Sequence, residues 1–347
     1  MPGDPALERI YARAVQLAAS REGALDAATV RAIAIDLEEF ATSLAMGLSK
    51  LPAMQRAALK RAIAIIQASA EQLDRSLIAR IGNARQISFS DTFRIMAQAQ
   101  QAAAETVGVP FHDLGAIRIP RLADAHAFVS VAQVYDFRTL ARAHVVGAAK
   151  EAVAIVRVGI LQGTAPEEIA RAIRPYMLGA SGIPVSVADL RRVPAEYRGQ
   201  AKQLAYNANR IAYSETHAAR MLAQAVRMRD DPFVAGGKWH TAPNRGKGLV
   251  PDICDVLRDA DFFGLGPGVY PAGRIPAPPH PWDRCNVTVV PRVIQSGEDW
   301  RQPKPAPDSY PMILDPRTDE LPHLNAMTPA ARGRVRRDLA ILLGSDN

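Results

Sequence analysis

The sequence has few cysteines, few aromatic residues and no long apolar run. Cys254 and Cys285 are the only cysteines in 347 residues, far too few for disulfides to hold a fold of this size. The first residues lack the basic stretch and apolar run of a signal peptide. The most apolar span, 143–161, contains three charged residues, whereas a membrane helix needs about 20 mostly apolar residues. We therefore expect a soluble protein made in a reducing compartment.

The positive charge is concentrated in the middle of the chain. The formal charge is +7, from 42 basic and 35 acidic residues. Residues 111–230 carry 16 of the basic and 10 of the acidic side chains, and 14 of those 16 are arginines. Arginine suits bidentate contacts to phosphate, so this stretch fits nucleic-acid binding through counterion release. It also fits a solvated helical surface, which the shortage of aromatic residues for base stacking favours.

The first 110 residues predict a series of separate helices. Apolar residues recur at helical spacing from Leu7 onward. Asp26 fits the N-cap of a second helix, and Pro52 fits the first turn of a third. Gly82-Asn83 fits the end of that third helix, and a fourth is expected over 92–107.

The remaining sequence divides into a helical part and an irregular part. Helical patterns extend over 130–161 and 195–228. After residue 231 the helical period disappears, and short strands are expected over 237–241 and 287–290. Six prolines over 265–281 predict no regular structure there.

We therefore expect a mainly α protein with a small irregular α+β module near the C-terminus. Four consecutive regions follow from the composition. They are a helical region 1–110, a basic helical region 111–231, the α+β module 232–296, and a proline-rich tail 297–347 that ends in an amphipathic helix.

Glu215 occupies an apolar helical stripe with Ile211, Ala218 and Leu222. A buried carboxylate is costly unless it is paired, and Arg210, five residues away, is not ideally placed to pair with it. A partner from elsewhere in the chain is therefore needed. Glu215 is either a catalytic carboxylate with a raised pKa or a structural brace, together with Arg210, that tethers the α+β module. The brace is the favoured hypothesis, because no second carboxylate or nucleophile is placed locally.

Two short clusters could supply metal ligands. Asp252-Ile253-Cys254-Asp255 precedes His280-Pro281-Trp282-Asp283-Arg284-Cys285 by about thirty residues, and His240 lies upstream. Zinc takes four tetrahedral ligands from such residue types. The alternatives are two free cysteines or one disulfide formed after release from the cell. The glycine-rich stretch 264–268 lacks the Gly-Lys-Ser/Thr of a phosphate-binding loop and is not expected to bind phosphate.

Taken in order, these segments resemble the phage Mu F-like head morphogenesis family of minor capsid proteins. The pattern begins with Arg-Ile-Ala-x-Ser-Glu at 210–215 and the Trp239 strand, followed by Asp252, Cys254 and Asp255. It continues with the turn 264–270, the segment Pro278-Pro279-His280-Pro281, Cys285 and the strand 287–291. The resemblance covers about residues 130–295. Asp283 stands where the family has a cysteine, so a four-thiolate site within one chain is excluded.

The resemblance implies a non-enzymatic minor head component associated with the portal of a tailed phage or prophage. Its role would be head assembly and DNA packaging or ejection, with the portal and major capsid proteins as partners and the virion as location after synthesis in the host cytoplasm. The implied cofactor is zinc, with Cys254, His280, Asp283 and Cys285 as ligands. Asp252, Asp255 and His240 are reserve ligands. Arg191, Arg192 and Arg198 are our candidates for contact with double-stranded DNA or an acidic portal surface.

Two enzymatic alternatives stay open. The first is a zinc-dependent hydrolase in which Glu215 acts as general base. The second is a toxin-like transferase, although the sequence shows no appended effector domain.

Overall fold

The computed structural model describes residues 4–50, 56–110, 137–161, 168–169, 201–242, 253–279, 285–292, 329–330 and 332–333. The described part is mainly helical with one small three-stranded sheet, which confirms the expected fold class. The long helices are α1 (Pro5–Ser49), α2 (Arg56–Thr106), α5 (Phe137–Leu161) and α8 (Ala201–Asp230), and α9 (Ile253–Asp259) is short. No described helix is long and apolar enough to cross a membrane.

The N-terminal helices are fewer and longer than the sequence predicts. Asp4 caps α1, because its Oδ1 accepts a hydrogen bond of 2.7 Å from the Ala6 amide, and Pro5 occupies the first helical position. The expected break at Asp26 is wrong, since α1 continues through it. The expected stop at Gly82-Asn83 is also wrong, since α2 continues to Thr106.

The sheet is antiparallel, in the order β2-β1-β3. Its strands are β1 (Val234–His240), β2 (Val269–Pro271) and β3 (Asn286–Pro291), so both predicted strands are present, with β1 beginning earlier. In β3, Val287, Val289 and Pro291 are buried and alternate with partly exposed residues, which is the period of a half-buried strand. The prediction of no regular structure over 265–281 is wrong, because β2 lies there. Pro271 is compatible with β2 because it ends an edge strand.

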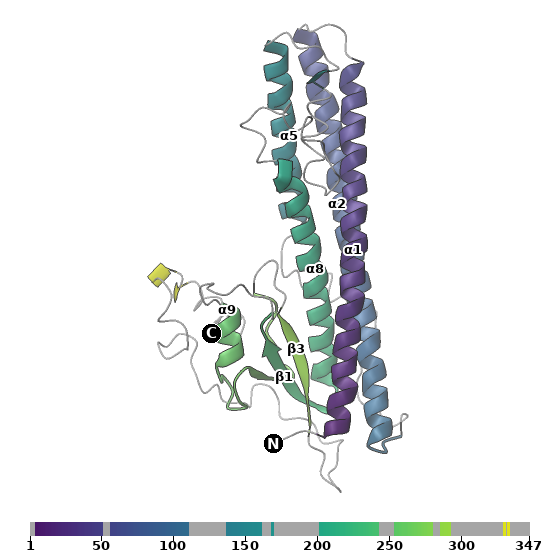
Figure 1. The fold of residues 1–347 in the computed structure, drawn as a ribbon, viewed down its shortest axis with the longest axis vertical. Helices are drawn as coiled ribbons and strands as arrows, with labels where there is room; N and C mark the ends of the chain where they lie inside the picture. Colours follow the sequence, from purple (N-terminus) through teal and green to yellow (C-terminus); the bar gives the residue numbers. More distant parts are fainter. Residues whose placement is uncertain are drawn as a thin grey trace. The chain divides into compact units, whose positions relative to one another are not determined.

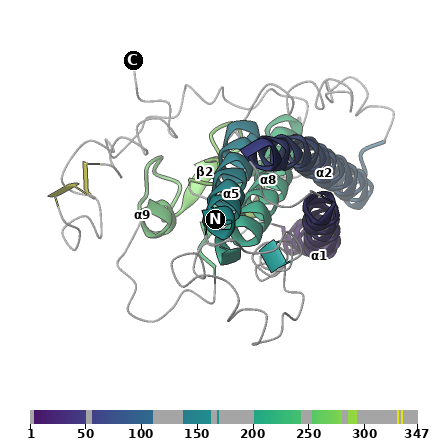
Figure 2. The same cartoon turned by 90° about the horizontal axis from the view of Figure 1, so that it is seen from above.

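The chain folds into two compact units, each built from segments far apart in the sequence. Unit 1 comprises 1–23, 86–134 and 216–347, and unit 2 comprises 24–85 and 135–215. Helices α1, α2 and α8 therefore contribute residues to both units (Figures 1 and 2). These units cut across the four consecutive regions that the composition indicates.

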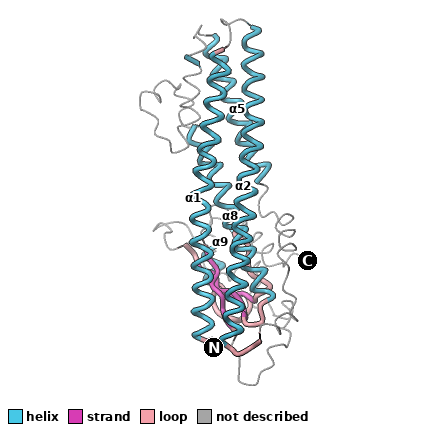
Figure 3. The backbone as a smooth tube through the Cα atoms, turned by 90° about the vertical axis from the view of Figure 1, so that its right-hand side faces the viewer, coloured by secondary structure: helices cyan, strands magenta, loops and turns pink. Residues whose placement is uncertain are grey.

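Unit 1 contains the sheet, α9, the beginning of α1 and the ends of α2 and α8. Figure 3 shows the strands beside these helices. Its core joins Tyr11 of α1, Met96 of α2 and Met228 of α8 to Trp239 of β1 and Leu257 of α9. Burying large apolar side chains from five elements in one cluster holds the short strands, which a three-stranded sheet alone would not stabilise.

Unit 2 is all helical in its described part. Leu37 and Leu44 of α1, Leu77 of α2, Ala152 of α5 and Ala212 of α8 are almost fully buried in its core. The spacing of seven between Leu37 and Leu44 is the repeat expected where one helix face packs on others.

The close approach of β1 and β2 predicts that Gly236 cannot be replaced by a larger residue without loss of stability. A Cβ atom at Gly236 of β1 would lie 2.2 Å from the backbone oxygen of Tyr270, whereas a Cβ at Gly23 in α1 would have nothing within 4 Å. We expect Gly236→Ala to destabilise unit 1 by about 2 kcal/mol. Gly23→Ala should stabilise by up to about 1 kcal/mol, because it removes chain entropy within a helix. Urea unfolding followed by circular dichroism measures both, and equal effects of the two substitutions would contradict the close strand packing.

Candidate functional site

The described residues that carry the family resemblance in the α+β module lie on or next to the sheet and α9. Trp239 is fully buried in β1. Cys254 is the second residue of α9, and Cys285 immediately precedes β3. Both cysteines are buried in the unit 1 core. The turn 264–268 leads into β2, and three of its glycines have positive φ.

Gly268 shows why this turn is rich in glycine. Its φ is +70°, and a Cβ there would lie 2.5 Å from the Arg258 carbonyl oxygen. Its amide donates to the Ala260 carbonyl (2.9 Å), and its own carbonyl accepts from the Trp239 amide (2.8 Å). The turn therefore closes the module by backbone hydrogen bonds between the end of α9 and β1, a structural use of the glycines.

The predicted zinc ligands are only partly within the described residues. His280, Asp283 and the reserve ligand Asp252 lie outside them. Within the described residues, no group of three or more His, Cys, Asp or Glu side chains is suitably placed for a metal ion. Thiolates are good zinc ligands, so Cys254 and Cys285 fit the chemistry and would supply two of four donors. The zinc site stays a prediction.

The two reserve ligands that the structure describes have protein partners. His240 Nε2 lies 2.8 Å from Thr288 Oγ1 on β3. Burial, with a contribution from nearby Lys238, lowers the pKa of His240, so its neutral form is favoured. Asp255 lies 3.2 Å from Arg258 Nη1, one turn further along α9.

Glu215 is fully buried, and it forms an ion pair with a residue from a distant part of the sequence. Arg85 Nε of α2 lies 3.4 Å from Glu215 Oε2, and the two side chains are 7% and 1% exposed. Burial lowers the pKa of Arg85, while the Glu215 carboxylate opposes that shift and nearby Arg138 adds to it. A partner from elsewhere in the chain is what the sequence analysis expects for Glu215. Arg210, the other residue of the predicted brace, accepts a 2.7 Å hydrogen bond at its backbone oxygen from Ser214 Oγ.

The most extensive buried polar network in the described residues lies elsewhere, in unit 1. Glu22 of α1 accepts from Arg220 Nε through Oε2, and its Oε1 lies 2.9 Å from His217 Nδ1. Arg220 Nη2 donates to Asn286 Oδ1 at the start of β3 (2.7 Å). Gln224, one turn along α8, donates to the Val287 carbonyl (2.6 Å). We call these five side chains, from α1, α8 and β3, the Glu22 network.

The electrostatics of the Glu22 network favour a charged carboxylate. Burial by itself raises the pKa of Glu22, but the hydrogen bond from His217 and the charge of Arg220 outweigh it and hold the pKa below its ordinary value. Glu22, His217 and Arg220 are 7%, 3% and 1% exposed. A carboxylate and a guanidinium at this depth are stable only as a pair.

A second polar contact fixes the end of α8 in unit 1. Tyr11 Oη of α1 donates to Asp231 Oδ2 (2.6 Å), and Asp231 Oδ1 accepts from the Phe233 amide (2.9 Å). Burial, reinforced by Asp231, raises the pKa of Tyr11 well above its ordinary value, so the phenol stays a donor. Arg227 lies over the Phe93 ring with its guanidinium carbon 4.8 Å from the ring centroid.

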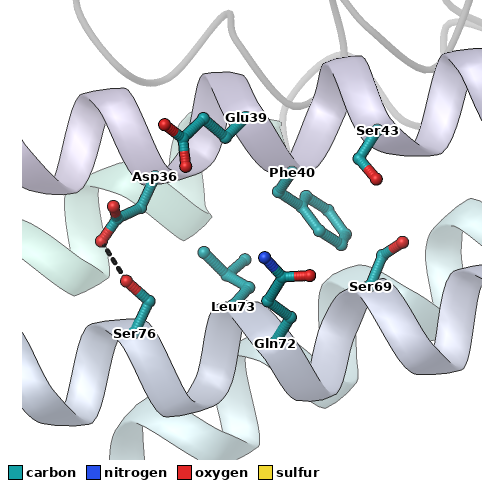
Figure 4. Close-up of a pocket in the computed structure, with 8 residues that line it drawn as sticks. All are labelled: Asp36, Glu39, Phe40, Ser43, Ser69, Gln72, Leu73 and Ser76. Carbon is teal, nitrogen blue, oxygen red and sulfur yellow. Dashed lines mark hydrogen bonds between the residues drawn. The ribbon is translucent and has the colours of Figure 1, made fainter.

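A small polar cavity of about 50 Å³ lies between α1 and α2 in unit 2 (Figure 4). Two carboxylates line it, those of Asp36 and Glu39. Asp36 accepts from Ser76 Oγ (2.6 Å) and from Arg80 Nη2 (2.7 Å). The ion pair with Arg80 gives Asp36 a structural role in the contact between the two helices.

Sequence reasoning missed the Glu22 network. Its members span residues 22 to 286, and nothing in the local sequence links Glu22 to Arg220. The available signal was weak: several polar residues, among them His217, Arg220 and Gln224, follow Glu215 along the same helix. The candidate contact residues Arg191, Arg192 and Arg198 lie outside the described residues.

Comparisons with known proteins add no relative. No family model matches the chain, and no curated protein and no solved structure matches it either.

The Glu22 network predicts a pH-dependent contribution to stability. Replacing Glu22 by Gln leaves the buried Arg220 without its counter-charge, so we expect a loss of about 3 kcal/mol at pH 7. Because the folded pKa of Glu22 is lowered, the carboxylate stabilises the fold above the ordinary value of about 4.3, and this is lost as the pH falls through the folded pKa.

The gap in the free energy of unfolding between the wild type and Glu22→Gln should accordingly narrow as the pH falls. Urea unfolding from pH 7 to pH 3 measures it. Glu105→Gln is the matched control, since Glu105 is exposed on α2 and accepts a hydrogen bond from the nearby Gln101. A gap that stays constant with pH would show that the Glu22 charge contributes nothing.

Proposed function

We propose that this protein is a minor capsid or head morphogenesis protein of a tailed phage or prophage, acting at the portal in head assembly and DNA packaging or ejection. One observation carries the proposal. Trp239, Cys254, the turn 264–270 and Cys285 belong to separate segments of the family pattern, and they fall on one sheet-and-helix module in unit 1. Chance motif matches scattered over a sequence would not need to share a core.

The construction of unit 1 suits a structural role. The Glu22 network links β3 to α8 and α1, and Tyr11 links α1 to the segment before β1. Directional, fully buried hydrogen bonds resist sliding of strands against helices better than apolar contacts alone. A small module attached in this way to long helices is suited to transmit force or to hold a fixed geometry within an assembly.

The proposed partners follow from the same assignment. They are the portal protein, the major capsid protein and double-stranded DNA, with Arg191, Arg192 and Arg198 as the proposed contact residues and the virion as the location. Zinc held by Cys254, His280, Asp283 and Cys285 belongs to the proposal as a structural ion. Its role would be to link the start of α9 to the segment before β3.

The alternative of a zinc-dependent hydrolase gains no support from the geometry around Glu215. A general base has to come within hydrogen-bond reach of the proton that it removes. The Glu215 side chain is 1% exposed and is paired with Arg85. No described contact favours this second function.

The assignment predicts that the chain is a component of virus particles. Particles induced from the producing host, with empty and DNA-filled heads separated on a density gradient, should contain this chain at a few copies per portal. Quantitative mass spectrometry against the portal protein measures the ratio. Absence from both particle classes, while the portal protein is present, would overturn the virion assignment.

The arginine cluster predicts salt-dependent binding to DNA. Reversing Arg191, Arg192 and Arg198 to Glu should reduce the slope of log K against log salt by about 2 to 3 and weaken binding to a duplex of any sequence. Fluorescence anisotropy with a labelled duplex measures this. Reversal of Arg9, Arg13 and Arg21, which are exposed on α1, gives the same charge change elsewhere. If both triple variants lose binding equally, net charge and not the proposed cluster is responsible.

A further inference from the structure

A long groove runs between α2 and α5 in unit 2. It is lined by residues 63–75 of α2 and 142–157 of α5, and its volume is about 1080 Å³. That volume reaches the upper limit of ordinary small-molecule pockets. At about 1.5 Å of rise per residue, the lining segments are about 18 to 22 Å long, which corresponds to three or four turns of a helix.

The middle of the groove is apolar and partly open. Ile66, Ala70 and Val145 form a buried base. Val146 also lines the groove, and 44% of it is exposed although it is a large aliphatic residue. Val153, two turns further along α5, lines the groove as well and is half-buried. An apolar strip of this kind within a concave surface, bordered by charged residues, is typical of an interaction site.

The α5 edge of the groove carries a line of positive charges. Arg142, Lys150 and Arg157 line it, all three are exposed, and they follow one another at intervals of eight and seven residues. Such intervals place them at about every second turn on one side of the helix. A partner helix with carboxylates about seven residues apart repeats along its axis with nearly the same period.

The α2 edge presents a buried acceptor. Asp74 lines the groove and is 9% exposed. Its Oδ2 accepts from Arg142 Nε at 3.2 Å, while its Oδ1 is buried and has no hydrogen-bond partner in the part of the chain that the structure describes. Leaving a buried acceptor unsatisfied costs about 1–3 kcal/mol, so a donor brought by a ligand would be favoured here.

We propose that this groove docks one amphipathic helix of a partner protein. The helix places an apolar stripe over Val146, carboxylates opposite Lys150 and Arg157, and one lysine, arginine or amide donor at Asp74 Oδ1. The charge pattern and the buried acceptor select this occupant over an uncharged apolar ligand, which would leave both edges unmatched. The inference goes beyond the proposed function and does not depend on it.

The test uses the full chain and a synthetic peptide as the probe. The peptide is a stapled, fluorescein-labelled helix of about 15 residues with leucines at helical spacing, two glutamates about seven residues apart on one side of the leucine stripe and one lysine on the other side. We expect saturable binding by fluorescence anisotropy. Val146→Glu should weaken it at least about tenfold, since it places a charge in the apolar strip.

A matched control lies on the same helix. Leu140 of α5 is 43% exposed and does not line the groove, so Leu140→Glu should bind the peptide as the wild type does. No saturable binding by the wild type, equal binding by Val146→Glu, or equal loss in both variants overturns the proposal. Sedimentation velocity adds one further outcome: self-association of the wild type that Val146→Glu abolishes would assign the groove to a second copy of this chain and overturn the partner helix.

A charge exchange keeps the proposal testable if Val146→Glu does not fold. Lys150 and Arg157 are exposed, so the double variant Lys150→Glu/Arg157→Glu should keep its fold. It should lose affinity for the glutamate peptide and gain affinity for a peptide with lysines at those two positions. Unchanged preference in the double variant overturns the proposed orientation of charges and with it the proposed helix.

Discussion

The arrangement of unit 1 depends on one buried carboxylate, that of Glu22. A charge in a position 7% exposed is stable only with a close counter-charge, and Arg220 supplies it. Arg220 then has a nitrogen left for Asn286, so pairing the carboxylate also fixes the beginning of β3. Gln224 repeats the attachment one turn later at the Val287 carbonyl. Three elements whose contacting residues range from Glu22 to Asn286 in the sequence are thereby held by one polar chain of contacts.

These hydrogen bonds help to fix the register of β3, which apolar packing alone does not fix for so short a strand. β3 has six residues, and its buried positions are aliphatic side chains that would tolerate a shift along the sheet. A slip of one residue would turn Val287 and Val289 outward and would also remove Asn286 from Arg220. The apolar pattern and the hydrogen bonds therefore specify the same register of β3 on β1. The alternation of buried residues disfavours a shift by one residue, and the hydrogen bonds disfavour any shift that takes Asn286 away from Arg220.

Sequence reasoning recovered the elements whose patterns are local. The alternation in β3 and the helical period of α8 were sufficient to predict both. The continuity of α1 and α2 was not predictable from local signals. Asp26 in α1 and Gly82-Asn83 in α2 each lower helix stability by only about 1 kcal/mol per residue. Packing along a buried helix face outweighs this loss. β2 was missed because proline density hides a three-residue edge strand. Arg85 was missed as a partner of Glu215 because 130 positions separate the two.

The polar run Ser214-Glu215-Thr216-His217 shows how the structure changes the meaning of a sequence pattern. Four consecutive polar residues, all of them buried, look like the beginning of a reactive site. Residues two apart on a helix point in nearly opposite directions, and accordingly Glu215 meets Arg85 of α2 while His217 meets Glu22 of α1. The backbone oxygen of Thr216 accepts from Ser88 Oγ (2.8 Å), and Ser214 bonds to its own helix. Each polar group thus has a structural partner, and the run is explained by α8 contributing to the cores of both units.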